Sequence, residues 1–133
     1  MKVKILPSKT SGEVSAPPSK SFAHRYLIGS VLSCGKCVIK NIADSDDISA
    51  TLSCIEQLGG SVTKDGNIVT VIPTNEKQIE NAVFDCKESG STLRFFIPVV
   101  LATGAKNCTF LGSERLLARG IKEYEKLFEN SDV

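Results

Sequence analysis

The sequence repeats its own pattern after about 70 residues, and this feature constrains the fold more than any other. The motifs Ser19-Lys20-Ser21 and Ser89-Gly90-Ser91 each precede an apolar segment with helical spacing, and their matching serines lie 70 residues apart. A repeat of this length predicts a unit of strand, helix, strand, helix and hairpin. The second copy reaches Val133 without its hairpin, so we expect about one and a half to two units. The predicted fold class is α/β (α+β).

A buried helix is predicted near the start of the first unit. Pro17-Pro18 favours extended backbone, and Ser21 is the predicted N-cap of a helix that reaches about Leu32. Apolar residues lie on most sides of this segment, which is typical of a central element. The strands predicted around it cover residues 2–6, 12–16 and 36–41.

A second helix and a hairpin complete the first unit. Asp46 is the predicted N-cap of this helix, and Gly59-Gly60 ends it. Asp65-Gly66 lies between two alternating segments, residues 61–64 and 67–72, which is the strongest hairpin signal in the chain. The second unit is predicted to contain a strand near Val83-Phe84, a helix from Ser91 to about Ala102, a strand over residues 107–111 and a last helix from about Leu117.

The composition is that of an ordinary soluble globular protein. The 133 residues include 16 Lys and Arg against 15 Asp and Glu, which gives a net charge of +1. This balance argues against a basic nucleic-acid-binding protein. The longest uncharged apolar stretch, residues 95–102, is far shorter than the ~20 residues that span a bilayer, and the first residues lack a secretory signal. We therefore expect a cytoplasmic protein without nucleic-acid or membrane partners.

The five cysteines favour free thiols, because their number is odd and no export signal precedes them. Cys34 and Cys37 form a CxxC pair, but they follow a helix, whereas a reactive thiol lies at a helix N-terminus. A zinc site would need a second pair, and the single histidine, His24, lies upstream. Structural cysteines are favoured, and a thiol or zinc module is the alternative.

Hydroxyl and basic side chains gather at three predicted helix starts. The free N–H groups of a helix start favour anions, and Gly90 allows a ligand to approach the backbone closely. Ser21 and Arg25 lie four residues apart, and hence on one helix face. The sequence thus predicts an anion-binding site, with Lys20, Ser21, Arg25, Gly90, Arg115 and Arg119 as candidates.

Each candidate also has a purely structural interpretation. Ser21 and Ser91 can act only as N-caps. Arg25 or Arg94 can pair with a surface carboxylate for little energy. Arg119 can belong to a solvated helix face. His24 has no evident partner for nucleophilic catalysis, and we interpret it as structural.

Four motifs occur in the order and at the spacing of a known family. They are PPSKSFAHR at residues 17–25, DSDD at 44–47, SGSTLR at 89–94 and SERLLARGI at 113–121. Together they resemble the N-terminal portion of the 5-enolpyruvylshikimate-3-phosphate synthase (3-phosphoshikimate 1-carboxyvinyltransferase) family. The related UDP-N-acetylglucosamine enolpyruvyl transferase, whose first motif is built on SGAKN, is the alternative.

The resemblance implies an activity and an architecture. The family transfers the enolpyruvyl group of phosphoenolpyruvate to the 5-hydroxyl of shikimate 3-phosphate and releases phosphate, in the shikimate pathway to chorismate and aromatic amino acids, without a metal or an organic cofactor. Its inside-out barrel has two domains of three βαβαββ units, whose helix N-termini point into the cleft between them. Residues 1–16 are then strands of the domain completed by the C-terminal half. Residues 17–133 are a partial domain, with repeat one at about 17–85 and an incomplete repeat two at about 86–133.

The resemblance also implies roles for single residues. Lys20 matches the lysine that contacts both substrates and is the implied catalytic residue. Ser21 and Arg25 match ligands of shikimate 3-phosphate, and Arg25 binds its carboxylate. Gly90 matches the glycine that lines the phosphoenolpyruvate pocket, and Arg119 matches an arginine that binds phosphoenolpyruvate.

Two positions depart from the family pattern. Glu88 stands where many members have asparagine, which adds negative charge near an anion site. Gly120 replaces a proline that commonly follows the arginine, which loosens that helix start by roughly 1 kcal/mol.

Members of the family are about three times longer than this chain, by resemblance, and their acid and base carboxylates lie beyond its length. We therefore expect an N-terminal fragment that is inactive alone. We also expect it to self-associate through exposed apolar surface and strand edges, whereas the full-length enzyme is expected to be a monomer. A stand-alone anion-binding module is the alternative.

Overall fold

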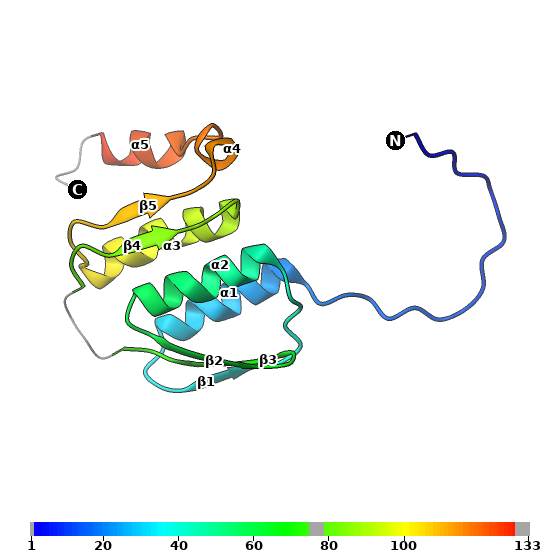
Figure 1. Ribbon diagram of the computed structural model, residues 1–133, viewed down its shortest axis with the longest axis horizontal. Coiled ribbons are helices and arrows are strands. Elements are labelled where there is room, and N and C mark those ends of the chain that lie inside the picture. The colour runs from blue at the N-terminus through cyan, green and yellow to red at the C-terminus, as the bar shows by residue number, and fades with distance from the viewer. Residues whose placement is uncertain (1, 75–78, 130–133) are drawn as a thin grey trace.

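The computed structural model describes residues 2–74 and 79–129. Three long helices pack against one another at its centre (Figure 1): α1 (Lys20–Val31), α2 (Asp46–Gln57) and α3 (Gly90–Thr103). A sheet of β1 (Cys37–Ile39), β2 (Ser61–Asp65) and β3 (Ile68–Ile72) covers α1 and α2. On the other side of these two helices lie β4 (Val83–Asp85), β5 (Thr109–Leu111), α4 (Glu114–Leu117) and α5 (Lys122–Phe128). The predicted α/β class is confirmed.

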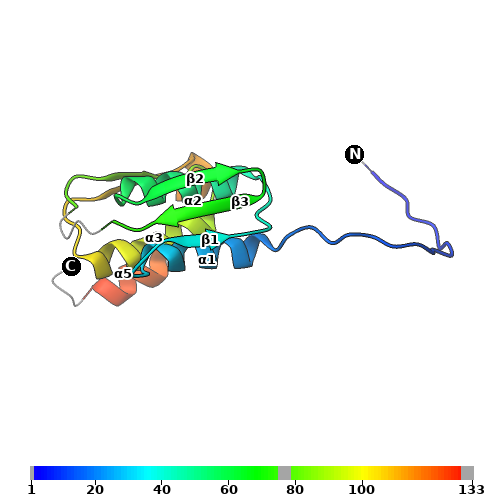
Figure 2. The ribbon, with the colours of Figure 1, turned by 90° about the horizontal axis from the view of Figure 1, so that it is seen from below.

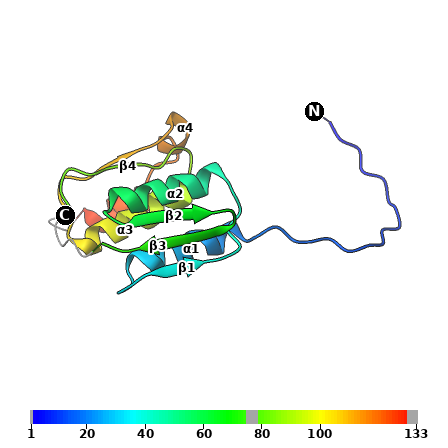
Figure 3. The same cartoon turned by 60° about the horizontal axis from the view of Figure 1, so that its bottom comes forward.

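The larger sheet is antiparallel, with the strand order β1-β3-β2 (Figure 2). Asp65 pairs with Ile68, so the hairpin loop is Gly66-Asn67, one residue later than the sequence predicted. Gly66 has a φ of 55°, a conformation that glycine adopts without strain. Val69 and Val71 of the central strand β3 are fully buried in the core that this sheet shares with the helices (Figure 3).

The smaller sheet pairs β4 and β5 in parallel, with Phe84 opposite Phe110. α3 connects the two strands, which is the connection that parallel pairing requires. The Phe84 ring is fully buried and lies 5.1 Å from the Phe110 ring and 6.0 Å from the Phe96 ring, measured between centroids. This aromatic cluster fixes the strand pair against α3.

Serine N-caps start four of the helices, and they correct three predictions. In each cap the serine Oγ accepts from the backbone N–H three residues later. The predicted caps Ser21, Asp46 and Ser91 lie inside the first turns, because a serine just ahead of each already satisfies the free N–H groups. The four capping residues are Ser19, Ser45, Ser89 and Ser113.

Helix α1 is less enclosed than its composition predicts. Leu27 is fully buried, but Phe22 and Tyr26 are each 61% exposed, and their rings stack at 6.1 Å on the outer face. The two strands predicted over residues 2–6 and 12–16 are absent, and this segment runs extended and exposed away from the body (Figure 1). A strand forms only where another strand pairs with it, and none of the described strands does so here. The assignment of residues 1–16 to a second domain stays a prediction.

The last helix begins five residues later than the predicted start at about Leu117, and a short helix that was not predicted precedes it. α4 ends at Leu117 and α5 begins at Lys122, with Gly120 between them at a φ of 65°. A proline, whose φ is fixed near −65°, could not take this conformation. Gly120 therefore determines the backbone conformation between α4 and α5, which is a larger effect than the loosened helix start that the sequence predicted. Within the described residues, no helix combines the length and apolar character that crossing a bilayer requires.

A matched pair of isoleucines tests the position of the core. Ile55 on α2 is fully buried, whereas Ile5 is 89% exposed. We expect Ile55→Ala to lower the free energy of unfolding by about 2–5 kcal/mol, because it removes buried methyl groups and leaves a cavity. Ile5→Ala is the control and should change it by less than about 0.5 kcal/mol. Urea unfolding followed by circular dichroism measures both, and equal effects would contradict this core.

Candidate functional site

Three of the predicted site residues line one cavity of about 500 Å³. Lys20 comes from the start of α1, Gly90 from the start of α3, and Arg119 from the segment between α4 and α5. The fold therefore brings together residues that are up to 99 positions apart in the sequence. The other residues that line the cavity are Asp47, Glu88, Ser91, Arg94 and Phe95.

Lys20 is held by a carboxylate from the neighbouring helix. Its Nζ donates to Asp47 Oδ2, and Asp47 lies in the first turn of α2, where the helix dipole favours a negative charge. The Lys20 side chain remains 54% exposed, so the pair contributes little to stability. Its effect is to keep the ammonium group beside the cavity, which both Lys20 and Asp47 line.

Gly90 leaves room for two guanidinium groups. A β-carbon at this position would lie 2.9 Å from Nη1 of Arg94 and 3.7 Å from Nη1 of Arg119. A glycine at position 90 thus allows the two guanidinium groups to come close to the helix backbone, and it is not required by a positive φ. The Arg94 side chain also donates from Nη2 to the Gly120 carbonyl oxygen at 3.4 Å. Two cations therefore converge on the first turn of α3.

Arg25 and Ser21 lie near the cavity without lining it. Arg25 Nη1 donates to the Ser21 carbonyl oxygen at 2.9 Å and also to Ser21 Oγ, as their spacing on one helix face allows. The guanidinium carbon lies 5.2 Å from the centroid of the Phe95 ring, a cation–π contact. Because Phe95 lines the cavity, Arg25 contacts one of its lining residues. Arg115, the remaining candidate, is exposed on α4 and does not line it.

The sequence comparisons relate the chain to one enzyme family. The EPSP synthase (3-phosphoshikimate 1-carboxyvinyltransferase) family matches residues 6–133. The chain belongs to this family. Relatives named 3-phosphoshikimate 1-carboxyvinyltransferase are 39% identical in Clostridium novyi (strain NT), 41% in Clostridium botulinum (strain Eklund 17B / Type B) and 42% in Clostridioides difficile (strain 630). Each alignment covers 98% of this chain and 31–32% of the relative, so the chain spans about a third of the relatives' length.

A buried polar network ties the helices together beneath the EPSP synthase motifs. His24 Nδ1 of α1 lies 2.8 Å from Thr51 Oγ1 of α2, which lies 2.8 Å from Thr92 Oγ1 of α3. Thr92 Oγ1 donates to Ser89 Oγ at 2.7 Å. All four residues are at least 98% buried. His24 is therefore structural, as expected, and the network fixes the helix starts relative to one another.

Sequence reasoning missed Arg94 as part of the cavity. It was given only the interpretation of a surface ion pair, yet the ion pairs in the described part of the chain involve none of its nitrogens. Its position four residues after Gly90, on the same helix face, was the available signal. Thr51 and Thr92 were also missed, because a threonine inside a helix does not reveal its partner in the sequence.

No cysteine is among the residues that line this cavity. All five cysteines are free; Cys34 follows the end of α1 and Cys37 is the first residue of β1, so the pair follows a helix and leads into a strand as expected. Among the residues that the structure describes, no group of three or more His, Cys, Asp or Glu could hold a metal ion. The hydrogen bond with Cys86 and burial raise the pKa of the Cys54 thiol, which keeps it protonated.

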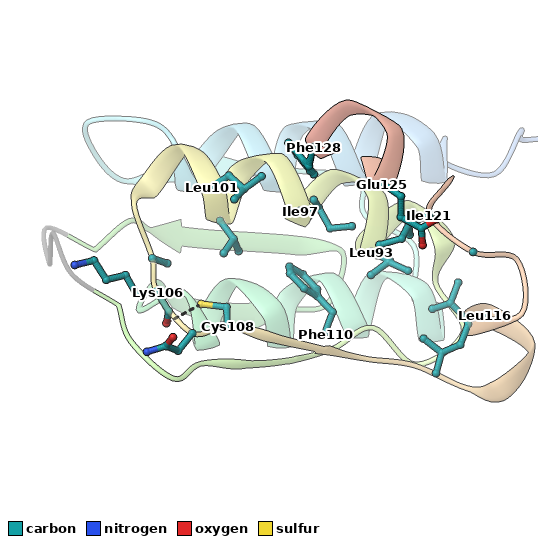
Figure 4. Close-up of a pocket in the computed structure, with 15 residues that line it drawn as sticks. Leu93, Ile97, Leu101, Lys106, Cys108, Phe110, Leu116, Ile121, Glu125 and Phe128 are labelled. Atoms are coloured by element: carbon teal, nitrogen blue, oxygen red, sulfur yellow. Dashed lines mark hydrogen bonds between the residues drawn. The ribbon is translucent and has the colours of Figure 1, made fainter. Parts of the chain in front are cut away.

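A larger cavity of about 880 Å³ lies elsewhere, between α3, β5 and the segment from α4 to α5 (Figure 4). Its lining is mainly apolar, with Ile97, Phe110 and Phe128 pointing into it. Lys106, near one end, accepts a hydrogen bond at its backbone oxygen from Cys108 Sγ at 3.5 Å. None of the predicted site residues lines this cavity, and an apolar lining does not suit a phosphorylated substrate.

The buried histidine predicts a specific pH dependence. Burial lowers the pKa of His24 below its usual 6.5, helped by the charges of Lys20 and Arg25 and opposed by Asp47. The unfolded chain therefore binds a proton before the folded chain does, so stability is complete above pH 6.5 and falls as the pH drops below it, by up to ~1.4 kcal/mol per pH unit. Since His24 is the single histidine, we expect His24→Gln to remove this slope between pH 6.5 and 5.5. Urea unfolding across this range measures it, and equal slopes in both proteins would contradict the assignment.

Proposed function

We propose that this chain supplies the anion-binding part of an enolpyruvyl transferase. In the proposed reaction, the 5-hydroxyl oxygen of shikimate 3-phosphate loses its proton and bonds to C2 of phosphoenolpyruvate while C3 gains a proton. A proton then leaves C3, the bond from C2 to the phosphate oxygen breaks, and phosphate leaves. The observation that carries the proposal is the convergence of Lys20, Gly90 and Arg119 on one cavity. Membership of the family supports the choice of substrates.

The proposed roles follow from charge and position. Lys20 contacts both substrates and is the catalytic residue, because its ammonium stabilises charge that moves onto the leaving phosphate. Arg119 binds phosphoenolpyruvate, and the backbone at Gly90 lies against the same anion. Ser21 and Arg25 bind shikimate 3-phosphate, Arg25 through the carboxylate. Their hydrogen bonds to each other leave further guanidinium donors for this purpose.

The Arg119 side chain tests the phosphoenolpyruvate subsite. We expect Arg119→Gln to weaken the binding of phosphoenolpyruvate to the chain about 10- to 100-fold, because a hydrogen bond to a charged group contributes about 1.5–3 kcal/mol. A titration followed by the backbone amide NMR signals of residues 90–94 measures the Kd. Arg115→Gln is the matched control, since Arg115 precedes the cavity on α4 and does not line it. Equal affinities in the two variants would contradict the proposed role of Arg119 in binding phosphoenolpyruvate.

We expect this chain to bind phosphoenolpyruvate but not to catalyse the reaction. The cavity is lined by two carboxylates, Asp47, which is paired with Lys20, and the exposed Glu88. We therefore expect that this chain does not transfer a proton to C3 of phosphoenolpyruvate. Incubation with both substrates should release no phosphate above the rate without protein, in a colorimetric phosphate assay. A full-length clostridial relative is the positive control. Release above background would show that the chain is catalytically complete.

Self-association stays a prediction, and two features support it. The 880 Å³ cavity presents an apolar surface (Figure 4), and Leu101 and Leu117, which line it, are 39% and 55% exposed. Burying such a surface against a second copy would be favourable.

A further inference from the structure

Two buried cysteines from different elements meet in the core. Cys54 lies on α2 and Cys86 directly follows β4, and both are fully buried in the same hydrophobic cluster. Cys54 Sγ donates to the Asp85 carbonyl oxygen at 3.9 Å. Cys86 Sγ donates to the Phe84 carbonyl oxygen at 3.8 Å. Because α2 packs on β4 and both thiols reach neighbouring carbonyls of that strand, the packing brings the two sulfur atoms together.

The two thiols differ in their readiness to ionise. Cys54 donates a hydrogen bond to the Cys86 sulfur, and this bond lowers the pKa of Cys86, against the opposing effects of burial and the Asp85 charge. The same bond raises the pKa of Cys54, and burial adds to the rise. Since a thiolate is the nucleophile in sulfur chemistry, Cys86 is the thiol that reacts first, and Cys54 is placed to follow it.

Oxidation suits this pair better than metal binding does. In the part of the chain that the structure describes, no group of three or more His, Cys, Asp or Glu could hold a metal ion. The Asp85 carboxylate is paired with Lys87. The CxxC pair offers no comparable arrangement, because Cys34 is exposed and the hydrogen bonds of Cys37 Sγ lie within its own loop.

We propose that Cys54 and Cys86 are a modification site for hydrogen peroxide, which oxidises them to an internal disulfide. The Cys86 thiolate attacks one peroxide oxygen, the O–O bond breaks, and the leaving hydroxide takes up a proton, which gives a sulfenic acid and one water. The Cys54 thiol then loses its proton and attacks the Cys86 sulfur, the S–O bond breaks, and a second water leaves. The two thiols lose two electrons, and the peroxide is reduced to two waters.

The structure indicates how a small oxidant reaches the pair and what the disulfide joins. β4 has three residues and pairs only with β5 among the described strands, and so small a sheet opens locally at less cost than the helical core. The Cys86 carbonyl oxygen accepts from the Ser89 N–H at 2.8 Å, and Ser89 is the N-cap of α3. The disulfide would therefore link α2 to the turn that leads into α3.

Mass spectrometry of a full-length variant that keeps only this pair tests the proposal. Cys34→Ser, Cys37→Ser and Cys108→Ser remove the three cysteines that are not buried, and the folded variant is incubated with hydrogen peroxide. We expect its intact mass to fall by two hydrogen atoms and an unreduced digest to contain the peptides of Cys54 and Cys86 joined. Dithiothreitol should reverse both changes. Circular dichroism checks that the oxidised protein is folded.

Two further substitutions in the same background test the order of attack. In Cys54→Ala, Cys86 should stop at the sulfenic acid, which dimedone labels. In Cys86→Ala, we expect at least tenfold less dimedone labelling of Cys54, because its thiol stays protonated. A folded parent variant that stays reduced, or that gains oxygen without a cross-link, would overturn the proposal, and equal labelling would overturn the order. None of these results bears on the anion cavity, since no cysteine lines it.

Discussion

The helix starts in this chain are positioned by a buried chain of hydrogen bonds that runs from one helix to the next. His24, Thr51 and Thr92 come from α1, α2 and α3, and their polar atoms lie 2.8 Å apart at each step. Such groups are costly to bury unless they are paired, so the network tolerates few arrangements of the helices. The cavity depends on it, because Lys20 lies four residues before His24 and Gly90 two residues before Thr92. The same hydrogen-bond network thus contributes to stability and positions the residues of the cavity.

The sequence predicted most elements of the fold because their signals are local. Hydrophobic spacing located the three long helices, and Asp65-Gly66 located the hairpin to within one residue. The errors occurred where the outcome depends on distant partners or on backbone conformation. Residues 2–16 have an alternating pattern but no strand to pair with in the described chain. The break at Gly120 comes from a positive φ that helical periodicity does not reveal.

The same limit applies to the cavity. Lys20, Gly90 and Arg119 could be nominated from the residue types at three helix starts and from the family motifs. That they line one cavity could not be derived from spacing, since the packing of α1 against α3 decides it. Arg94 was given a surface role because a lone arginine on a helix usually has one. Its position beside the Gly120 carbonyl oxygen and Arg119 depends on the tertiary structure, which the local sequence does not reveal.

The predicted internal repeat offers a reason for the apolar lining of the 880 Å³ cavity. Leu27 of α1 and Ile97 of α3 lie at matching positions, 70 residues apart. In the first unit, α1 packs on β3 and Leu27 is fully buried, whereas Ile97 lines the 880 Å³ cavity. Under the predicted repeat, the apolar cavity is the counterpart of the surface on which β3 packs against α1. The anion cavity differs, because its arginine side chains offer several N–H donors and no hydrogen-bond acceptor. They can stabilise a leaving phosphate but cannot move a proton, so in the proposed reaction proton transfer falls to other groups.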